Sequence, residues 1–195
     1  QLKNLHGLIV APGFGGRGIE GKIDAISYVR ENKIPFFGIC LGMQMAVIEY
    51  ARNILMHSNA NSTEIDKDTD YPVIDIMESQ KGVVNKGGTM RLGAWNCDLT
   101  SLSKVADVYG KEQITERHRH RFEFNNQYKF EVFEKGALKV SGVNPETDLV
   151  EIIENQDHPW FVGVQYHPEY KSTVLNPHPL FVDFVQASLQ YNHSK

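Results

Sequence analysis

The sequence predicts an α/β fold built on a doubly wound open sheet, largely parallel with antiparallel additions and with helices on both faces. Two observations lead to this prediction. Over residues 7–55, short apolar runs alternate with segments of helical periodicity, which is the pattern of parallel βαβ units. Over residues 90–166, short β-type segments follow one another before a final amphipathic helix. The 195 residues include 41% hydrophobic residues, which suffices for one domain with a core of normal size.

The first part of the chain carries the parallel pattern. An apolar run leads into a glycine-rich loop at 12–18, and isoleucines then recur every three or four positions. Pro35 ends this helical segment and opens a second strand, which a second helical segment follows at once. The expected elements are a strand over 7–11, a helix over 19–30, a strand over 36–39 and a helix over 41–55.

The remaining segments are shorter and less regular. The polar segment 57–70 is expected to be a loop, and the glycine- and lysine-rich segment 80–89 is expected to be mobile. Leu180, Phe184 and Leu189 share one face of the last helix. The expected strands are 72–77, 90–99, 116–124, 138–143, 149–154 and 160–166.

Composition narrows the function classes. The net charge of -4 argues against general binding to nucleic acid or acidic membranes, because such binding needs a basic surface. Two cysteines do not make a disulfide framework, and a reducing, cytoplasmic compartment is the simplest interpretation. No apolar run approaches the length of a membrane span.

Cys40 lies in a sequence typical of a nucleophile. The run Gly38-Ile39-Cys40-Leu41-Gly42 has the form Gly-x-nucleophile-x-Gly between a predicted strand and a predicted helix. Such an elbow presents the side chain at the carboxyl edge of the sheet, and the helix amino terminus is expected to favour thiolate. The alternative is a buried structural cysteine, which is the interpretation we give to Cys97 because it lacks the glycine frame.

His167 is the candidate base. It ends a β-type run, and Glu169 lies two residues on, so in extended chain both side chains point the same way. The Glu169 carboxylate would then bond one imidazole nitrogen and leave the other facing the thiol. The alternative is an exposed pair at a strand end, and sequence alone does not show that Cys40 and His167 meet.

These motifs resemble the class I, triad-type glutamine amidotransferases. The runs Gly38-Ile-Cys-Leu-Gly-Met-Gln44 and Gln165-Tyr-His-Pro-Glu169 carry that resemblance. Other stretches resemble the CTP synthase branch of the family in particular, and the likeness extends over about residues 7–185. These stretches are Ala-Asn-Ser-Thr-Glu at 60–64, Gly-Gly-Thr-Met-Arg-Leu-Gly at 87–93, Glu-Arg-His-Arg-His-Arg at 116–121 and Leu-Val-Glu-Ile-Ile-Glu at 149–154.

The resemblance implies a flavodoxin-like sheet and a role for each site residue. Cys40, His167 and Glu169 match the catalytic triad, and the N–H of Leu41 matches an oxyanion-hole donor. The family usually has Pro-Gly-Gly-Phe before the first helix, where this chain has Ala-Pro-Gly-Phe at 11–14. Since proline has no N–H, the second oxyanion donor is expected to be Gly13. The positions that match glutamine-binding residues are Phe14, Gln44, Glu64 and Arg121.

Three of the four binding residues also have a purely structural interpretation. Gln44 lies one helical turn after the cysteine and would then face solvent, Glu64 would be a solvated loop carboxylate, and Phe14 would be core. Arginines and histidines alternate over 117–121, so they fall on opposite faces of a strand. The His-x-His pair suits a metal, but no third ligand is obvious nearby, so no metal is expected.

The resemblance also implies partners outside the chain. The sequence has no Gly-x-x-x-x-Gly-Lys-Ser/Thr phosphate loop, and its sheet opens almost directly on a strand. We expect residues 1–195 to be a glutaminase domain, a fragment of a longer chain that lacks the amidoligase (synthetase) domain. The family's whole enzyme would use L-glutamine, ATP and Mg²⁺ to aminate UTP to CTP, with GTP as activator, and would form a homotetramer. Segment 80–91 and the strand 117–121 are candidate GTP contacts.

Two other functions remain open from the sequence. A γ-glutamyl hydrolase of the same superfamily would share Cys40 and His167. A non-catalytic regulatory domain would keep the fold alone, which the presence of the cysteine, histidine and glutamate together disfavours.

Overall fold

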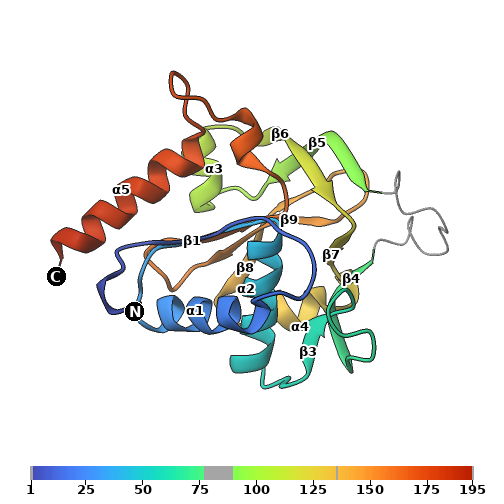
Figure 1. The fold of residues 1–195 in the computed structure, drawn as a ribbon. Helices are drawn as coiled ribbons and strands as arrows, with labels where there is room; N and C mark the ends of the chain where they lie inside the picture. The colour runs from blue at the N-terminus through green and yellow to red at the C-terminus, as the bar shows by residue number, and fades with distance from the viewer. Residues whose placement is uncertain (1, 77–89, 135, 195) are drawn as a thin grey trace.

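The computed structural model describes residues 2–76, 90–134 and 136–194, and it shows two sheets with helices around them (Figure 1). The seven-stranded sheet has the order β1-β2-β10-β9-β8-β5-β6. Its strands in that order are Leu8–Val10, Phe36–Ile39, Phe161–Val164, Val150–Asn155, Leu138–Val143, Arg91–Leu99 and Gln113–His120. The α/β class predicted from the sequence is confirmed.

The prediction of a largely parallel sheet was wrong. Only the β1–β2 and β2–β10 pairs are parallel within the described sheet, and the other four pairs are antiparallel. The cause is connection length, because a parallel neighbour needs a long crossover whereas an antiparallel neighbour needs only a turn. The turns after β8 and β9 are too short for a crossover, so β8, β9 and β10 run in alternating directions. The parallel part is nevertheless the part that carries Cys40.

Helices cover both faces of the large sheet, as predicted (Figure 1). Phe36 of β2 packs on one side with α1 (Ile19–Glu31), α2 (Leu41–Asn53) and α4 (Lys129–Glu134). Phe37 points to the other side, where α3 (Lys104–Tyr109) and α5 (Pro179–His193) pack. Neighbouring residues of one strand therefore serve two separate hydrophobic clusters, which is why β2 has no polar side chain.

The small sheet has the order β3-β4-β7, with strands Ala60–Ser62, Tyr71–Ile76 and Phe122–Phe124. The expected loop at 57–70 therefore contains a strand, because Ala60, Asn61 and Ser62 are buried and pair in parallel with β4. The single strand expected over 116–124 is divided at Arg121 between the two sheets. This division brings the end of β6 and the start of β7 close to the elbow.

The other predicted strands and helices are present within a few residues of their expected bounds, a normal uncertainty for element ends. Short 3₁₀ turns complete the described chain at η1 (Leu2–Asn4), η4 (Asn126–Tyr128) and η5 (Pro168–Lys171). The mobile segment expected at 80–89 lies outside the described residues. Across the part of the chain that the structure describes, every helix is too short or too polar to span a bilayer.

Candidate active site

Cys40 stands between β2 and α2 in a backbone conformation that is rare for a residue with a side chain, at φ 51°. Its N–H donates to the carbonyl of Val164 on β10 over 2.7 Å, which fixes the turn to the neighbouring strand. Gly42 leaves no space for a Cβ, because one there would overlap the carbonyl oxygen of Val10. Together these contacts form the tight elbow that the glycine frame predicted.

The thiol of Cys40 is buried, and burial raises its pKa to about 12. The Leu41 N–H at the start of α2 and the Gln165 side-chain amide lower that pKa, but they only partly offset the loss of water. The start of α2 thus favours thiolate in the expected direction, but desolvation outweighs it, so the thiol stays protonated in the resting chain. A base must remove the proton before the sulfur can attack.

His167 has the arrangement of such a base. Its Nδ1 lies 2.6 Å from Glu169 Oε1, and its ring stacks on Tyr170 with centroids 4.8 Å apart. The main-chain N–H of His167 donates to the main-chain carbonyl of Arg117 on β6 over 2.8 Å, so the backbone at His167 is held in place as well. The Nε2 atom of His167 is buried and has no hydrogen-bond partner among the described residues, so it is not bonded to the Cys40 thiol either. If Glu169 accepts the Nδ1 proton, Nε2 has a free lone pair for a proton from elsewhere.

The sheet brings the cysteine and the histidine to one edge. β2 and β10 are parallel neighbours with Ile39 opposite Val164, so the residues that follow both strands emerge at the same carboxyl edge. Gln165 donates to Cys40 Sγ over 3.6 Å, and the charge of Glu169 acts on the Cys40 thiol. The segment that carries His167 therefore lies beside the elbow.

The predicted oxyanion loop also reaches the elbow. The loop between β1 and α1 passes so close that a Cβ on Gly13 would lie 3.1 Å from Leu41 Cδ2. The Leu41 N–H is directed at the Cys40 sulfur. The structure thus places Gly13 next to Leu41.

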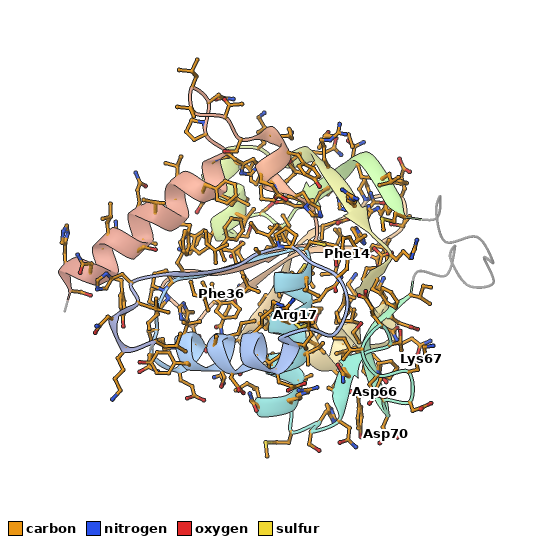
Figure 2. All side chains as sticks on the ribbon, in the orientation of Figure 1. Phe14, Arg17, Phe36, Asp66, Lys67 and Asp70 are labelled. Carbon is orange, nitrogen blue, oxygen red and sulfur yellow. The ribbon has the colours of Figure 1, made fainter. Side chains whose placement is uncertain are left out.

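Two of the four predicted binding residues meet at this glycine-rich loop. Gly15 donates its N–H to Glu64 Oε1 over 3.0 Å, which holds the loop against the turn that follows β3. Glu64 is therefore not simply a solvated loop carboxylate. Phe14 is 55% exposed and lies on the loop rather than in the core, unlike Phe36 (Figure 2).

The other two binding residues lie on α2 and at the bend between β6 and β7. Gln44 is buried rather than solvent-facing, and its Nε2 donates to the Phe122 carbonyl over 2.8 Å and to Gln165 Oε1 over 3.2 Å. Arg121 precedes Phe122 at the bend between β6 and β7. All four predicted binding residues are thus in segments that border Cys40.

Gln165 is a further residue of this site. It is part of the Gln-Tyr-His-Pro-Glu motif, but no role was predicted for it. It lies directly after β10, in the bend that leads to η5, and the one sequence signal that could have marked it is its place in the run Gln165-Tyr-His-Pro-Glu169.

A buried polar cluster behind the site was also missed. Arg91 lies between two carboxylates, 2.6 Å from Glu151 Oε1 and 3.5 Å from Glu123 Oε2. Burial raises the pKa of Glu123 to about 8 and that of Glu151 to about 7. Arg91 is the last residue of the 80–91 segment that was a candidate for contacting GTP. Its side chain is buried in this structure and therefore not exposed to such a ligand.

The histidines and arginines of β6 alternate as predicted. His118 and His120 are buried and hydrogen-bonded to each other over 2.9 Å, whereas Arg117 and Arg119 are exposed on the opposite face. Burial lowers the pKa of both histidines, that of His120 to about 3. No group of three or more metal-ligating side chains is present among the residues described.

Comparison with known proteins defines the class. Residues 1–187 match the family described as glutamine amidotransferase class-I. A glutamine amidotransferase from Thermotoga maritima has the same fold, with a TM-score of 0.57 at 15% identity over 87% of this chain and 58% of that one. The chain therefore belongs to the class I glutamine amidotransferase family.

More similar proteins define the branch, which is the glutaminase domain of CTP synthases. The CTP synthase of Christiangramia forsetii is 64% identical over 98% of this chain and 35% of its own length, and that of Bacteroides fragilis is 57% identical over 97% and 35%. The structure of the Trypanosoma brucei CTPS glutaminase domain with bound acivicin matches with a TM-score of 0.89, at 40% identity over 96% of this chain and 72% of that one. The chain spans about a third of the length of the curated relatives it matches.

Proposed function

We propose that this chain hydrolyses L-glutamine to glutamate and ammonia through a γ-glutamyl thioester on Cys40. One observation carries the proposal: the strained cysteine after β2 and the Glu169-bonded histidine after β10 emerge at the same edge of two paired parallel strands. A nucleophile, a base and a group that orients the base form the triad that thiol-dependent acyl transfer commonly uses.

In the first half of the reaction the sulfur attacks the side-chain amide carbon of glutamine. His167 Nε2 takes the thiol proton, because its lone pair has no other partner among the described residues. The N–H groups of Leu41 and Gly13 stabilise the oxyanion as it develops. The C–N bond then breaks, His167 returns the proton to the nitrogen, and ammonia leaves.

In the second half water attacks the thioester carbon. His167 accepts a proton from this water, the C–S bond breaks, and the proton passes to the sulfur. Glutamate leaves and the buried neutral thiol is restored, in keeping with the raised pKa of Cys40. Glu169 holds the imidazole in one tautomer throughout.

Selection of glutamine depends on the charged end of the amino acid. We propose that Glu64, Gln44 and Arg121 hold the zwitterionic end of glutamine, and that Phe14 lies next to the thioester site. Their position in the segments around Cys40 supports this assignment. A γ-glutamyl hydrolase would need room for a peptide beyond the side-chain amide, so comparing glutamine with γ-glutamyl peptides as substrates separates the two activities.

The decisive test compares the two buried cysteines. Cys40→Ala is expected to lose glutamine hydrolysis to background, whereas Cys97→Ala, which removes the other free thiol, is expected to keep it. Ammonia release measures turnover, and mass spectrometry after treatment with acivicin identifies the labelled cysteine. Turnover by the Cys40→Ala chain, or labelling confined to Cys97, would reject the proposal.

The whole protein has a wider proposed role. We propose that the chain is one domain of a longer homotetrameric CTP synthase in a reducing cytoplasm, and that its ammonia aminates UTP in a synthetase domain that uses ATP and Mg²⁺. GTP is the proposed activator, with the exposed Arg117 and Arg119 as contacts. The identity to CTP synthases over nearly all of this chain supports this role. GTP titration of the full-length enzyme with and without Arg119→Ala tests it.

A further inference from the structure

Gln165 is a buried side chain whose two polar atoms are both engaged, and one of its partners is the sulfur of Cys40. Its Nε2 donates to Cys40 Sγ over 3.6 Å, and its Oε1 accepts from Gln44 Nε2 over 3.2 Å. Its main-chain N–H donates to the Glu151 carbonyl over 2.8 Å. Both polar atoms of the Gln165 side-chain amide, and the main chain that carries it, are therefore held by hydrogen bonds.

The direction of this amide follows from a main-chain group. Gln44 Nε2 also donates to the carbonyl of Phe122 over 2.8 Å, and a carbonyl can only accept. The NH₂ group of Gln44 must therefore face both Phe122 and Gln165, which requires the oxygen of Gln165 to face Gln44. A flipped Gln165 would set two NH₂ groups against each other. The N–H of Gln165 is left to point at the sulfur.

We propose that Gln165 is a positioning residue of the thiol: it holds Cys40 Sγ in place and stabilises the thiolate by a hydrogen bond whose direction is set through Gln44 by the Phe122 carbonyl. This inference rests on the proposed function only for its catalytic consequence. The effect on the thiol follows from the contacts alone. A donor to a charged acceptor is worth more than one to a neutral acceptor, so the bond strengthens when the sulfur loses its proton.

Two substitutions separate the donor from the space it fills. Gln165→Met keeps about the same volume and removes both the N–H and the oxygen that accepts from Gln44. Gln165→Glu keeps an oxygen for Gln44 and places a carboxylate beside the sulfur. Tyr166→Phe is the matched control, because Tyr166 is the next residue, is also buried and loses one hydrogen bond, to the Tyr109 hydroxyl, without touching the sulfur.

The measurement is the rate at which iodoacetamide alkylates Cys40, followed by peptide mass spectrometry against pH. Because only thiolate reacts, the rate at a fixed pH below the thiol pKa falls about tenfold for each unit by which that pKa rises. We expect about a tenfold fall in Gln165→Met, a larger fall in Gln165→Glu and no change in Tyr166→Phe. In glutamine hydrolysis we expect kcat to fall about tenfold in Gln165→Met, with KM within about twofold.

The outcomes are distinguishable. Alkylation profiles of both Gln165 variants that coincide with the parent profile would overturn the inference, even if turnover fell. An unchanged profile in Gln165→Met alone would do the same, since that variant lacks the donor. If the parent chain hydrolyses no glutamine, the proposed function fails, and the alkylation profiles still decide the role of Gln165. Urea unfolding of each variant confirms that the folded chain is being compared.

Discussion

At the scale of single residues, the sequence was informative where two partners are close together in the chain. The hydrogen bond between His167 and Glu169 was predicted from the alternation of an extended chain, but the structure forms it differently, because Glu169 lies in the 3₁₀ turn η5 that begins directly after His167. The state of the Cys40 thiol was not predictable, because burial depends on segments far away in the chain. For the same reason Gln44 was open to a solvent-facing interpretation, although the structure buries it between β7 and Gln165.

Glu169→Gln tests the orienting role at this scale. The amide cannot stabilise the imidazolium as the carboxylate does, and its NH₂ group can donate to Nδ1 and so place the ring proton on Nε2, facing the thiol. We expect kcat for glutamine hydrolysis to fall about a hundredfold or more, with KM within about twofold. Steady-state ammonia release measures both.

The control for this substitution is Glu146→Gln, an exposed glutamate in the turn between β8 and β9. It should match the parent chain. Equal activity of Glu169→Gln and Glu146→Gln would mean that the carboxylate beside His167 has no part in turnover.

At the scale of elements, long periodic segments were predictable and short ones were not. The patterns of α1, α2 and α5 show helical periodicity over 13 or 15 residues. By contrast α3 and α4 have six residues each, too few to establish a period. β3 has the sequence Ala-Asn-Ser, which lacks β-branched and aromatic residues, so only its pairing with β4 makes it a strand.

A pair of glycine substitutions tests how closely α2 must approach β1. Gly42→Ala adds a methyl group that overlaps the Val10 carbonyl oxygen. Because this oxygen belongs to the backbone of β1, relieving the overlap requires a shift of the strand or of α2. We expect a loss of about 2 to 3 kcal/mol in the free energy of unfolding. Gly21→Ala places the same methyl group in α1, where nothing lies within 4 Å, and should gain about 0.5 to 1 kcal/mol.

Urea unfolding of both variants gives the two free energies. A Gly42→Ala chain as stable as Gly21→Ala would show that the contact between the elbow and β1 is loose.

At the scale of the whole molecule, the α/β class and the core on both faces of the sheet were predictable. The antiparallel direction of the later strands was also predictable, although a largely parallel sheet was predicted instead. The short gaps after β8 and β9 were visible in the sequence and are incompatible with crossovers. The division of residues 116–124 between two sheets was not visible there, because it depends on which strands lie beside each half.

Global stability should depend on pH through the buried cluster around Arg91. Glu123 and Glu151 have folded pKa values raised from 4.5 to about 8 and about 7, so the folded state binds more protons and stability falls as pH rises through that range. His118 and His120 have lowered pKa values, so their contribution falls as pH drops below their ordinary value of 6.5. The histidines oppose the carboxyl groups near pH 6.5, where unfolded histidine is half protonated, and they contribute little above about pH 7.5.

We therefore expect the free energy of unfolding in urea to fall by about 2 kcal/mol from pH 6.5 to 8. Glu123→Gln should remove most of this fall, because a neutral amide replaces the group with the higher pKa. Glu112→Gln, an exposed glutamate, should leave the fall unchanged. A parent chain whose stability rises over this interval would show that both carboxylates are ionised in the folded protein.

The place of β10 in the sheet has a consequence for biosynthesis. β10 lies between β2 and β9, and the amide that follows it and reaches Cys40 is 125 positions later in the chain. The elbow is therefore synthesised long before His167 and Gln165. On the proposed mechanism, a polypeptide that terminates before β10 has neither the base nor the amide donor, and we expect it to be inert rather than weakly active.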